Sequence, residues 1–162
     1  MASTPALEVL KKSALSKDLS EFECEVLAEL IELRALKDGE IVCGEGQSDS
    51  RLHGVVSGAL GVSRHDPATG EWQNLHVITV GDLAGELSFI DGTPHYSALR
   101  ALGETSIYSL ERTRLEALLE THPRIVYQVM RAIMRVVHTI QRRLSMQAAE
   151  LTNYIYKQHG RY

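Results

Sequence analysis

The sequence has few aromatic residues and no excess of basic ones. Phe, Trp and Tyr make up 6% of its 162 residues, which argues against an aromatic surface on which single-stranded nucleic acid could stack. Lys and Arg number 17 against 21 Asp and Glu, for a formal net charge of −4. Proteins that hold DNA electrostatically usually carry a basic face and a high isoelectric point. The composition therefore argues against nucleic-acid binding over the whole surface.

Cysteines and long apolar stretches are also scarce. Cys24 and Cys43 are too few for a disulfide framework and lack the Cys-x-x-Cys spacing of a redox or zinc site, so we expect two reduced, partly buried thiols. No run approaches the ~18 apolar residues of a membrane span. Residues 1–5 show no basic segment leading into an apolar one, as a signal peptide would. We therefore expect a cytoplasmic protein without a membrane segment.

The remaining composition, 44% hydrophobic and 23% charged, is that of a globular domain with a sizeable core. Its periodicity divides the chain into three zones. Residues 1–33 have a helical pattern, in which Ser20 and Glu23 fit a capping box. Residues 34–122 consist of short segments separated by turn residues, and residues 123–162 are a helical segment with a short tail. We predict an N-terminal helical segment, a β domain and a C-terminal helix.

The middle zone favours an all-β architecture. Segments with strand propensity recur about every ten residues, which is typical of a β-sandwich or β-barrel. Glycine-containing turns separate them, for example at residues 44–46, 57–58 and 66–70. The separate strand predictions include residues 52–56, 59–63, 96–101 and 106–110.

The last zone carries the clearest periodic signal. Pro123 suits the first turn of a helix. Apolar residues then follow at alternating spacings of four and three, interrupted by Gln147: Val126, Met130, Ile133, Val137, Ile140, Leu144 and Leu151. A seam of this kind is typical of a coiled coil and predicts a homodimer through Val126 to Leu144. The alternative is a helix lying on its own β domain, and Val129 and Val136 widen the apolar face enough for both.

The densest group of functional residue types lies between residues 81 and 98, GDLAGELSFIDGTPHYSA. Gly85 permits close approach of a ligand, and the residues after it predict a short helix whose free N–H groups attract an anion. Glu86 offers a carboxylate to sugar hydroxyls, so the segment suits a sugar phosphate. The structural alternative is an ordinary turn between two strands. The predicted ligand-binding residues are Gly85, Glu86, Leu87, Ser88, His95, Tyr96 and Ser97.

Residues 33–123 resemble the cyclic nucleotide-binding domain shared by catabolite-activator-type bacterial regulators and protein kinase A regulatory subunits. The motifs that carry the resemblance lie at residues 36–42, 44–46, 55–62, 81–98 and 131–144. The resemblance implies an eight-stranded β jelly roll with N-terminal helices and a C-terminal hinge helix. It also implies cyclic AMP or cyclic GMP as ligand, with Glu86 on the ribose 2′-hydroxyl and backbone amides near Gly85 and Leu87 on phosphate oxygens.

The chain departs from the family where the phosphate would bind. The family pattern places an arginine at the position of His95 and a small or hydroxylated residue at that of Tyr96. Truncating one partner of a buried charge pair costs about 2–5 kcal/mol, which is about 30- to 3,000-fold in affinity. A protonated His95 would be a weaker phosphate partner, a pocket partly filled by Tyr96 would suit another ligand, or the pocket is vestigial. A shifted strand register would bring Ser97 into the hydroxyl role.

Catalytic and metal-binding motifs are lacking. The seven histidines are scattered, with no His-x-His or His-Glu-x-x-His pair, and no Cys-x-x-Cys-His motif for haem is present. There is no Gly-x-Ser-x-Gly elbow and no P-loop lysine. We predict a protein that is not an enzyme and has no metal site.

Two functions therefore stay open. The first is a cyclic nucleotide-binding-like sensor or regulatory module that passes its output to a protein partner. The second is a structural or protein-interaction module that kept the fold and lost the ligand. Transcription factors of this class continue into a helix-turn-helix domain, for which too few residues follow Leu151, so we expect no direct DNA binding. The basic stripe formed by Arg131, Arg135, Arg142 and Arg143 is interpreted as a solvated helix face.

Overall fold

The N-terminal helices begin at residues whose side chains cap them. The structure, a computed structural model, describes residues 4–159. Residues 1–3 of the expected N-terminal segment and residues 160–162 of the expected C-terminal tail lie outside the described residues. Helix α1 (Pro5–Lys11) is capped by the Thr4 hydroxyl, and the 3-10 helix η1 (Ala14–Ser16) by Ser13. Helix α2 (Glu21–Ala28) begins at the predicted capping box of Ser20 and Glu23, in which both reciprocal hydrogen bonds form.

The helical zone ends before residue 33. Helix α2 ends at Ala28, and Ile31–Leu36 form strand β1, which pairs antiparallel with β6 (Ala98–Glu111). The helical interpretation of Leu30 and Ile31 is wrong, because a short apolar run does not by itself distinguish a helix end from a strand start. Pairing with β6, far along the chain, decides the outcome.

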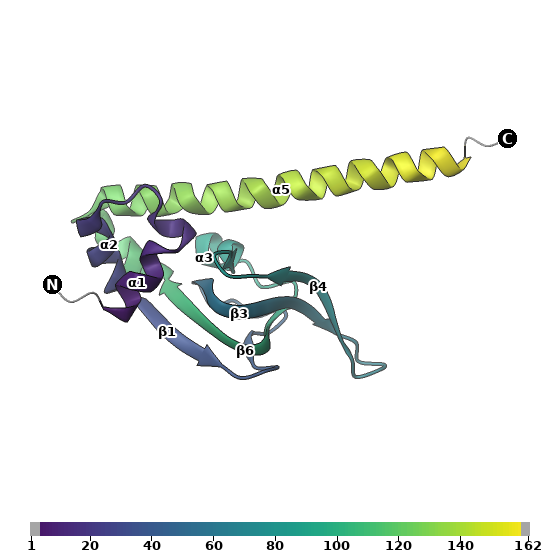
Figure 1. The fold of residues 1–162 in the computed structure, drawn as a ribbon, viewed down its shortest axis with the longest axis horizontal. Helices are drawn as coiled ribbons and strands as arrows, with labels where there is room; N and C mark the ends of the chain where they lie inside the picture. The colour runs from purple at the N-terminus through teal and green to yellow at the C-terminus, as the bar shows by residue number, and fades with distance from the viewer. Residues whose placement is uncertain (1–3, 160–162) are drawn as a thin grey trace.

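Antiparallel strands form the β domain (Figure 1). The sheet order is β1–β6–β3–β4, with β2 paired to β6 and β5 paired to β3. The remaining strands are β2 (Ile41–Cys43), β3 (Arg51–His65), β4 (Trp72–Ile78) and β5 (Leu83–Ala84). The other helices are α3 (Glu86–Asp91), α4 (Arg112–Glu116), the 3-10 helix η2 (Ala117–Leu119) and α5 (Pro123–His159).

The predicted class, mainly β with flanking helices and a long C-terminal helix, is confirmed, but the described strands number six rather than eight. Residues 52–56 and 59–63 belong to one strand, β3, and residues 96–101 and 106–110 largely to β6. The register of β3 on β6 shifts on both sides of Ser57. Gly58 has a φ of 76°, and a Cβ there would lie 2.5 Å from the Glu104 carbonyl oxygen. A bulge bends a strand without ending it. The glycine-containing turn predicted at residues 57–58 is therefore a bulge within β3 and not the end of a strand.

Two apolar clusters hold these elements together. One lies among the strands and contains Leu36, Val55, Leu60, Val62, Ile78, Ala84, Leu99, Ala101 and Ile107. The other joins the helices to the strands, and its fully buried members include Leu10, Leu15, Leu27, Leu52, Leu110, Ile125, Val129 and Ile133. The first turns of α5 therefore belong to the core of the domain.

This burial corrects part of the predicted dimer seam. Val126 and Ile133 are buried in the helix–strand cluster, and Met130 and Val137 pack partly against it. Val126 and Ile133 therefore face their own domain and not a second copy. An apolar stripe is satisfied by any apolar surface, and here the chain's own β domain supplies it.

The second half of α5 has a different environment. Ile140 is half-buried, whereas Leu144 and Leu151 are 56% and 61% exposed. A helix of 37 residues is about 55 Å long. Figure 1 shows its C-terminal part running beyond the β domain.

Candidate functional site

The turn between β5 and α3 holds the segment singled out in the sequence. Gly85 caps α3 with a φ of 81°, a left-handed conformation that side chains rarely adopt. A Cβ at this position would also lie 2.8 Å from the carbonyl oxygen of Arg51. Only glycine therefore allows the turn to lie against β3 and place Glu86 as the first residue of α3.

A cavity of about 730 Å³ lies between this turn, the strands and α5. Residues 81–88 and 93–97 form one wall, and side chains of α5 from Ala132 to Gln147 form the opposite wall. Val62, Leu75 and Ile78 line the strand side. The volume lies within the range of small-molecule and cofactor sites, about 300–1,000 Å³.

The fold brings all the predicted ligand-binding residues to this cavity, but their environments differ. The lining includes Gly85, Glu86, Leu87, Ser88, His95, Tyr96 and Ser97. Leu87 is half exposed, and Tyr96 is 69% exposed. Tyr96 therefore lies at the margin of the cavity, with most of its side chain exposed to solvent.

Glu86 and Ser97 are polar residues with capacity left for a ligand. Among residues 4–159, the half-buried Glu86 carboxylate has no hydrogen bond or ion pair. The Ser97 side chain is 2% exposed, and its hydroxyl has no hydrogen-bond partner within the described part of the chain. Buried polar groups are nearly always hydrogen-bonded. Both residues thus offer acceptor or donor capacity to a polar ligand.

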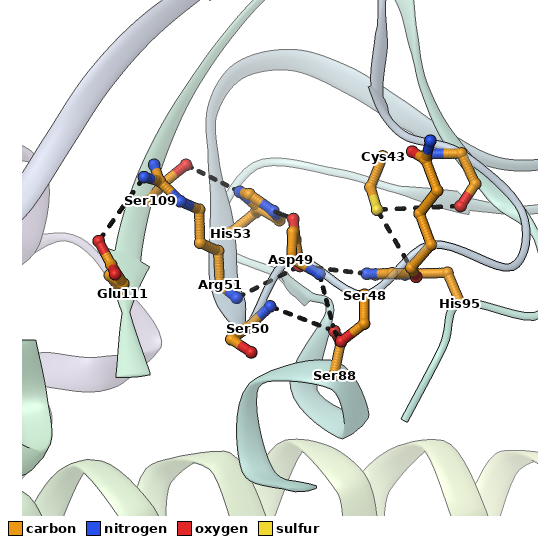
Figure 2. Close-up of polar contacts among 12 residues, drawn as sticks. Cys43, Ser48, Asp49, Ser50, Arg51, His53, Ser88, His95, Ser109 and Glu111 are labelled. Atoms are coloured by element: carbon orange, nitrogen blue, oxygen red, sulfur yellow. Dashed lines mark hydrogen bonds and ion pairs between the residues drawn. The ribbon is translucent and has the colours of Figure 1, made fainter. Parts of the chain in front are cut away.

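Ser88 is already engaged by the protein. Its Oγ lies 3.0 Å from Ser48 Oγ and accepts hydrogen bonds from the backbone N–H groups of Asp49 and Ser50 at 3.2 and 3.4 Å. Figure 2 shows Ser88 on α3 directed at this loop. Its hydroxyl fixes α3 to the β2–β3 loop, which is a structural role the sequence did not reveal.

His95 is directed at a carboxylate. Its Nε2 lies 3.3 Å from Asp49 Oδ1, while the other oxygen, Oδ2, lies 2.8 Å from His53 Nε2 (Figure 2). The second ring nitrogen of His53, Nδ1, lies 2.8 Å from Ser109 Oγ. A carboxylate can only accept, so both imidazoles donate to Asp49. The side chain that stands at the family's arginine position therefore already has an anionic partner.

The same contacts keep Asp49 ionised. Burial acts to raise its pKa, but hydrogen bonds from His53 and His95, the charge of His53 and the Arg51 backbone N–H together lower the pKa far below its ordinary value. An ionised carboxylate behind residues 81–98, here called the cassette, opposes the binding of a phosphate at His95. Sequence reasoning missed Asp49, because only the folded β2–β3 loop brings it to His95.

The positive charge at the cavity comes from other elements. Lys17, Arg135 and Arg143 line it. Arg143 donates from Nη2 to His76 Nε2 at 3.1 Å, and burial, followed by the charge of Arg143, lowers the pKa of His76. Arg135 pairs with Asp18 at 2.5 Å. The α5 arginines therefore do not all form a solvated face: Arg135 is half-buried in an ion pair, whereas Arg143 lines the cavity with an exposed side chain.

Both cysteines are free and buried. Burial, followed by the charge of Asp49, raises the pKa of the Cys43 thiol to about 11. The Cys43 sulfur, one Asp49 oxygen and one His95 nitrogen all lie within 4.8 Å of one another. These donors come from three segments, so a search for short metal motifs in the sequence could not find them.

A family model for the cyclic nucleotide-binding domain matches residues 33–122. The chain belongs to this family, as its resemblance predicted. Two of the relatives that it matches are named as regulatory proteins. It is 25% identical over 128 residues to a CRP-like cAMP-activated global transcriptional regulator of Mycobacterium tuberculosis, covering 79% of this chain and 57% of that protein.

It is also 25% identical over 114 residues to the cAMP-dependent protein kinase regulatory subunit of Dictyostelium discoideum, covering 68% of this chain and 35% of that one. The chain thus spans about half the length, or less, of these relatives. Among solved structures, a cyclic nucleotide-binding domain from Methylobacillus flagellatus has a TM-score of 0.72 at 25% identity, covering 85% of this chain and 77% of that one. Among the described helices, none is long and apolar enough to cross a membrane.

Proposed function

We propose that the chain is a regulatory sensor module that binds a cyclic nucleotide through a rearranged phosphate site. The observation that carries the proposal is the cavity between the cassette and α5, which contains the unpaired Glu86 carboxylate and the unpaired, buried Ser97 hydroxyl. Glu86 would accept from a ribose hydroxyl, the role that the family resemblance gives it. Ser97 would hydrogen-bond to another polar group of the ligand.

The phosphate would be neutralised from α5. Because His95 is bound to Asp49, its imidazole does not replace the missing arginine. Arg143 is a cation on the opposite wall whose partner among residues 4–159 is the ring of His76 rather than a carboxylate. Guanidinium groups bind phosphate oxygens well, since their donors match them in pairs. Binding to Arg143 would also link the ligand directly to the long helix.

The long helix would carry the output. A ligand between cassette and α5 changes the state of the module only if it binds one helix position better than another. We propose that α5 forms a homodimer through its exposed second half, with Ile140, Leu144 and Leu151 at the contact, and that a protein partner reads its geometry. No catalytic role is part of the proposal, and the cytoplasm stays the expected location.

A second function is favoured by one observation. The ionised Asp49 lies beside the cassette and holds the residue that stands in for the arginine. If this arrangement excludes cyclic phosphates, the chain is an interaction module that retained the fold. The two proposals differ in whether any cyclic nucleotide stabilises the protein.

Thermal unfolding with and without cyclic nucleotides tests the difference. Cyclic AMP, cyclic GMP and cyclic pyrimidine nucleotides are each added up to millimolar concentration. A ligand present at 100 times its Kd adds about 2.7 kcal/mol to the stability of the folded state. For a protein of this size that raises the unfolding midpoint by about 5–10 °C.

The matched variants are Glu86→Gln, Arg143→Gln and, as control, Glu71→Gln in the exposed β3–β4 loop. We expect Glu86→Gln to weaken binding about tenfold to a hundredfold, because a charge-assisted hydrogen bond contributes about 1.5–3 kcal/mol. Arg143→Gln should weaken it similarly, whereas Glu71→Gln should bind like the wild type. No midpoint shift with any nucleotide at millimolar concentration overturns the sensor proposal in favour of the interaction module.

A further inference from the structure

The strongest unexplained cluster lies behind the cassette, on the side away from α5. Cys43 is the last residue of β2, Asp49 lies in the β2–β3 loop, and His95 lies in the segment before β6. Their sulfur, oxygen and nitrogen donor atoms lie within 4.8 Å of one another. Figure 2 shows the three side chains converging from three directions. We propose that Cys43, Asp49 and His95 bind a divalent transition-metal ion of the zinc type.

The spacing of the donors suits a tetrahedral ion. Zinc bonds of about 2.0–2.3 Å place tetrahedral ligand atoms about 3.3–3.8 Å apart. Asp49 Oδ1 and His95 Nε2 already lie 3.3 Å apart. Since all the donors lie within 4.8 Å of one another, the Cys43 sulfur needs to approach by at most about 1.5 Å. The ion would take the place of the proton on His95 Nε2, and the metal-bound imidazole would carry that proton on Nδ1 instead.

The chemistry of the donors selects the ion. A thiolate, an imidazole and a carboxylate together are typical of zinc and related transition metals, whereas magnesium and calcium prefer oxygen ligands alone. Three protein ligands leave a fourth position for water or another small ligand. On binding, the Cys43 sulfur–hydrogen bond breaks, the proton passes to solvent, and a metal–sulfur bond forms with no change in oxidation state.

Cys43 has no strong competing interaction. Its sulfur lies 3.8 and 3.9 Å from the carbonyl oxygens of Gly44 and Gln47, the distances of weak thiol hydrogen bonds. Its side chain is buried, so the surroundings hold the sulfur in place. Among residues 4–159, the other cysteine, Cys24, belongs to no such cluster with histidine and aspartate, and it serves as the matched control.

Hydrogen bonds from neighbouring groups hold the Asp49 carboxylate in position. His53 donates to Asp49 Oδ2 at 2.8 Å, Ser109 Oγ lies 2.8 Å from the other nitrogen of His53, and the Arg51 backbone N–H donates to Asp49 Oδ1 at 3.2 Å. Metal-binding carboxylates are usually oriented by such outer hydrogen bonds. Two direct hydrogen bonds, from His53 and the Arg51 backbone, thus fix Asp49 toward His95 and Cys43 before any ion arrives, and Ser109 supports His53.

The ion would lie close to the cassette. A Cβ at Gly85 would lie 3.5 Å from His95 Cε1, so the imidazole touches the turn that begins α3. A divalent charge here would offset the negative charge of Asp49 next to the turn at Gly85. This consequence rests on the proposed nucleotide site, whereas metal binding itself does not.

Titration of the reduced, chelator-treated protein with Co²⁺ or Zn²⁺ alone, without nucleotide, tests the inference. We expect a tight site of one equivalent, a cobalt–thiolate charge-transfer absorption, and release of one proton from the thiol, measured by calorimetry in buffers of different ionisation enthalpy. Cys43→Ser should abolish the absorption, and His95→Gln should weaken the affinity at least about tenfold, the lower limit for disturbing even an outer ligand. Cys24→Ser should retain the tight site, the absorption and the proton release.

Circular dichroism and cooperative unfolding show whether each variant folds. If Cys43→Ser does not fold, the wild-type absorption and His95→Gln still decide. Binding without the thiolate absorption overturns the proposal, as does an absorption that Cys24→Ser removes or that survives in folded Cys43→Ser. Zinc binding with no response to any nucleotide would leave the metal site intact and refute only the proposed function.

Discussion

The two halves of α5 have the same apolar spacing and different surroundings. In the first half, Val126 and Ile133 are buried in the cluster that joins the helices to the strands, and Met130 packs partly against it. In the second half, Leu144 and Leu151 repeat the spacing of four and three with more than half of each side chain exposed. The cavity spans the transition, since its α5 wall runs from Ala132 to Gln147.

Under the proposed function, this difference would let a single helix connect a ligand to an interface. The first half is fixed by the core of its own domain and cannot move without breaking it. The second half has few contacts with the domain and is held at the cavity by side chains such as Arg143. A ligand bound in the cavity, as proposed above, would therefore act on the part of α5 that the core does not restrain.

The largest expected effect is on the free energy of unfolding, which should respond to a substitution in the first half of α5 and not to the matched one in the second half. Ile133→Ala should lower the free energy of unfolding by about 2–5 kcal/mol, because it leaves a cavity in a fully buried site. The unfolding midpoint should fall by about 4 °C or more. This loss should be the same at every protein concentration, as measured by thermal or denaturant unfolding.

Leu144→Ala is the matched substitution in the second half. In the dilute protein it should change stability by at most about 0.5 kcal/mol, as exposed substitutions do. Any larger loss should appear only at concentrations where a dimer forms, because association contributes by mass action. A loss of several kcal/mol from Leu144→Ala in dilute protein would show that the second half also packs on its own domain.

Association itself provides the second test. The double variant Leu144→Asp and Leu151→Asp places two charges in the proposed dimer contact, and light scattering after gel filtration should find a monomer with an unchanged circular dichroism spectrum. The matched control, Ala149→Asp and Asn153→Asp, adds charges away from this seam and should retain the wild-type mass. A monomeric wild type, or dissociation by both variants alike, would contradict a dimer through Leu144 and Leu151.

The two halves of α5 also illustrate which structural features could be predicted from the sequence and which could not. The capping box at Ser20 and the helix start at Pro123 were predictable, because caps act through neighbouring residues. The burial of Ile133 was not, since the spacing of a stripe does not identify the surface that covers it. The same holds for the strands: the bulge near Gly58 keeps β3 continuous only because β6 pairs on both sides of it.

The candidate site divides in the same way. The cassette was predictable from local residues, because Gly85 and Glu86 act through the turn they form. The state of His95 was not, because it depends on Asp49, which lies 46 residues earlier. The place of Arg143 was not predictable for a related reason: the sequence identifies a surface charge on a helix, and only the packing of α5 beside the cassette makes that charge part of the cavity lining.

The smallest expected effect concerns the ion pair between Asp18 and Arg135, where the two halves of α5 meet. The hydrogen bond from Arg135, opposed by partial burial and supported by the charges of Arg131 and Lys17, lowers the pKa of Asp18 below its ordinary value of 3.8. A carboxyl whose pKa is lowered in the folded state stabilises the protein at pH values above its ordinary pKa of 3.8. This contribution is lost as the pH falls from there through the lowered pKa. Solvent screening keeps the effect small.

Asp18→Asn should therefore unfold at a lower temperature than the wild type at neutral pH, and the two unfolding midpoints should converge below about pH 4, where the wild-type carboxyl also becomes neutral. Glu150→Gln, on the exposed second half, should follow the wild type at every pH. Scanning calorimetry at a series of pH values measures the difference. A gap between Asp18→Asn and the wild type that persists unchanged into strong acid would mean that the carboxylate charge does not fix Arg135, and the boundary between the two halves would then depend on apolar packing alone.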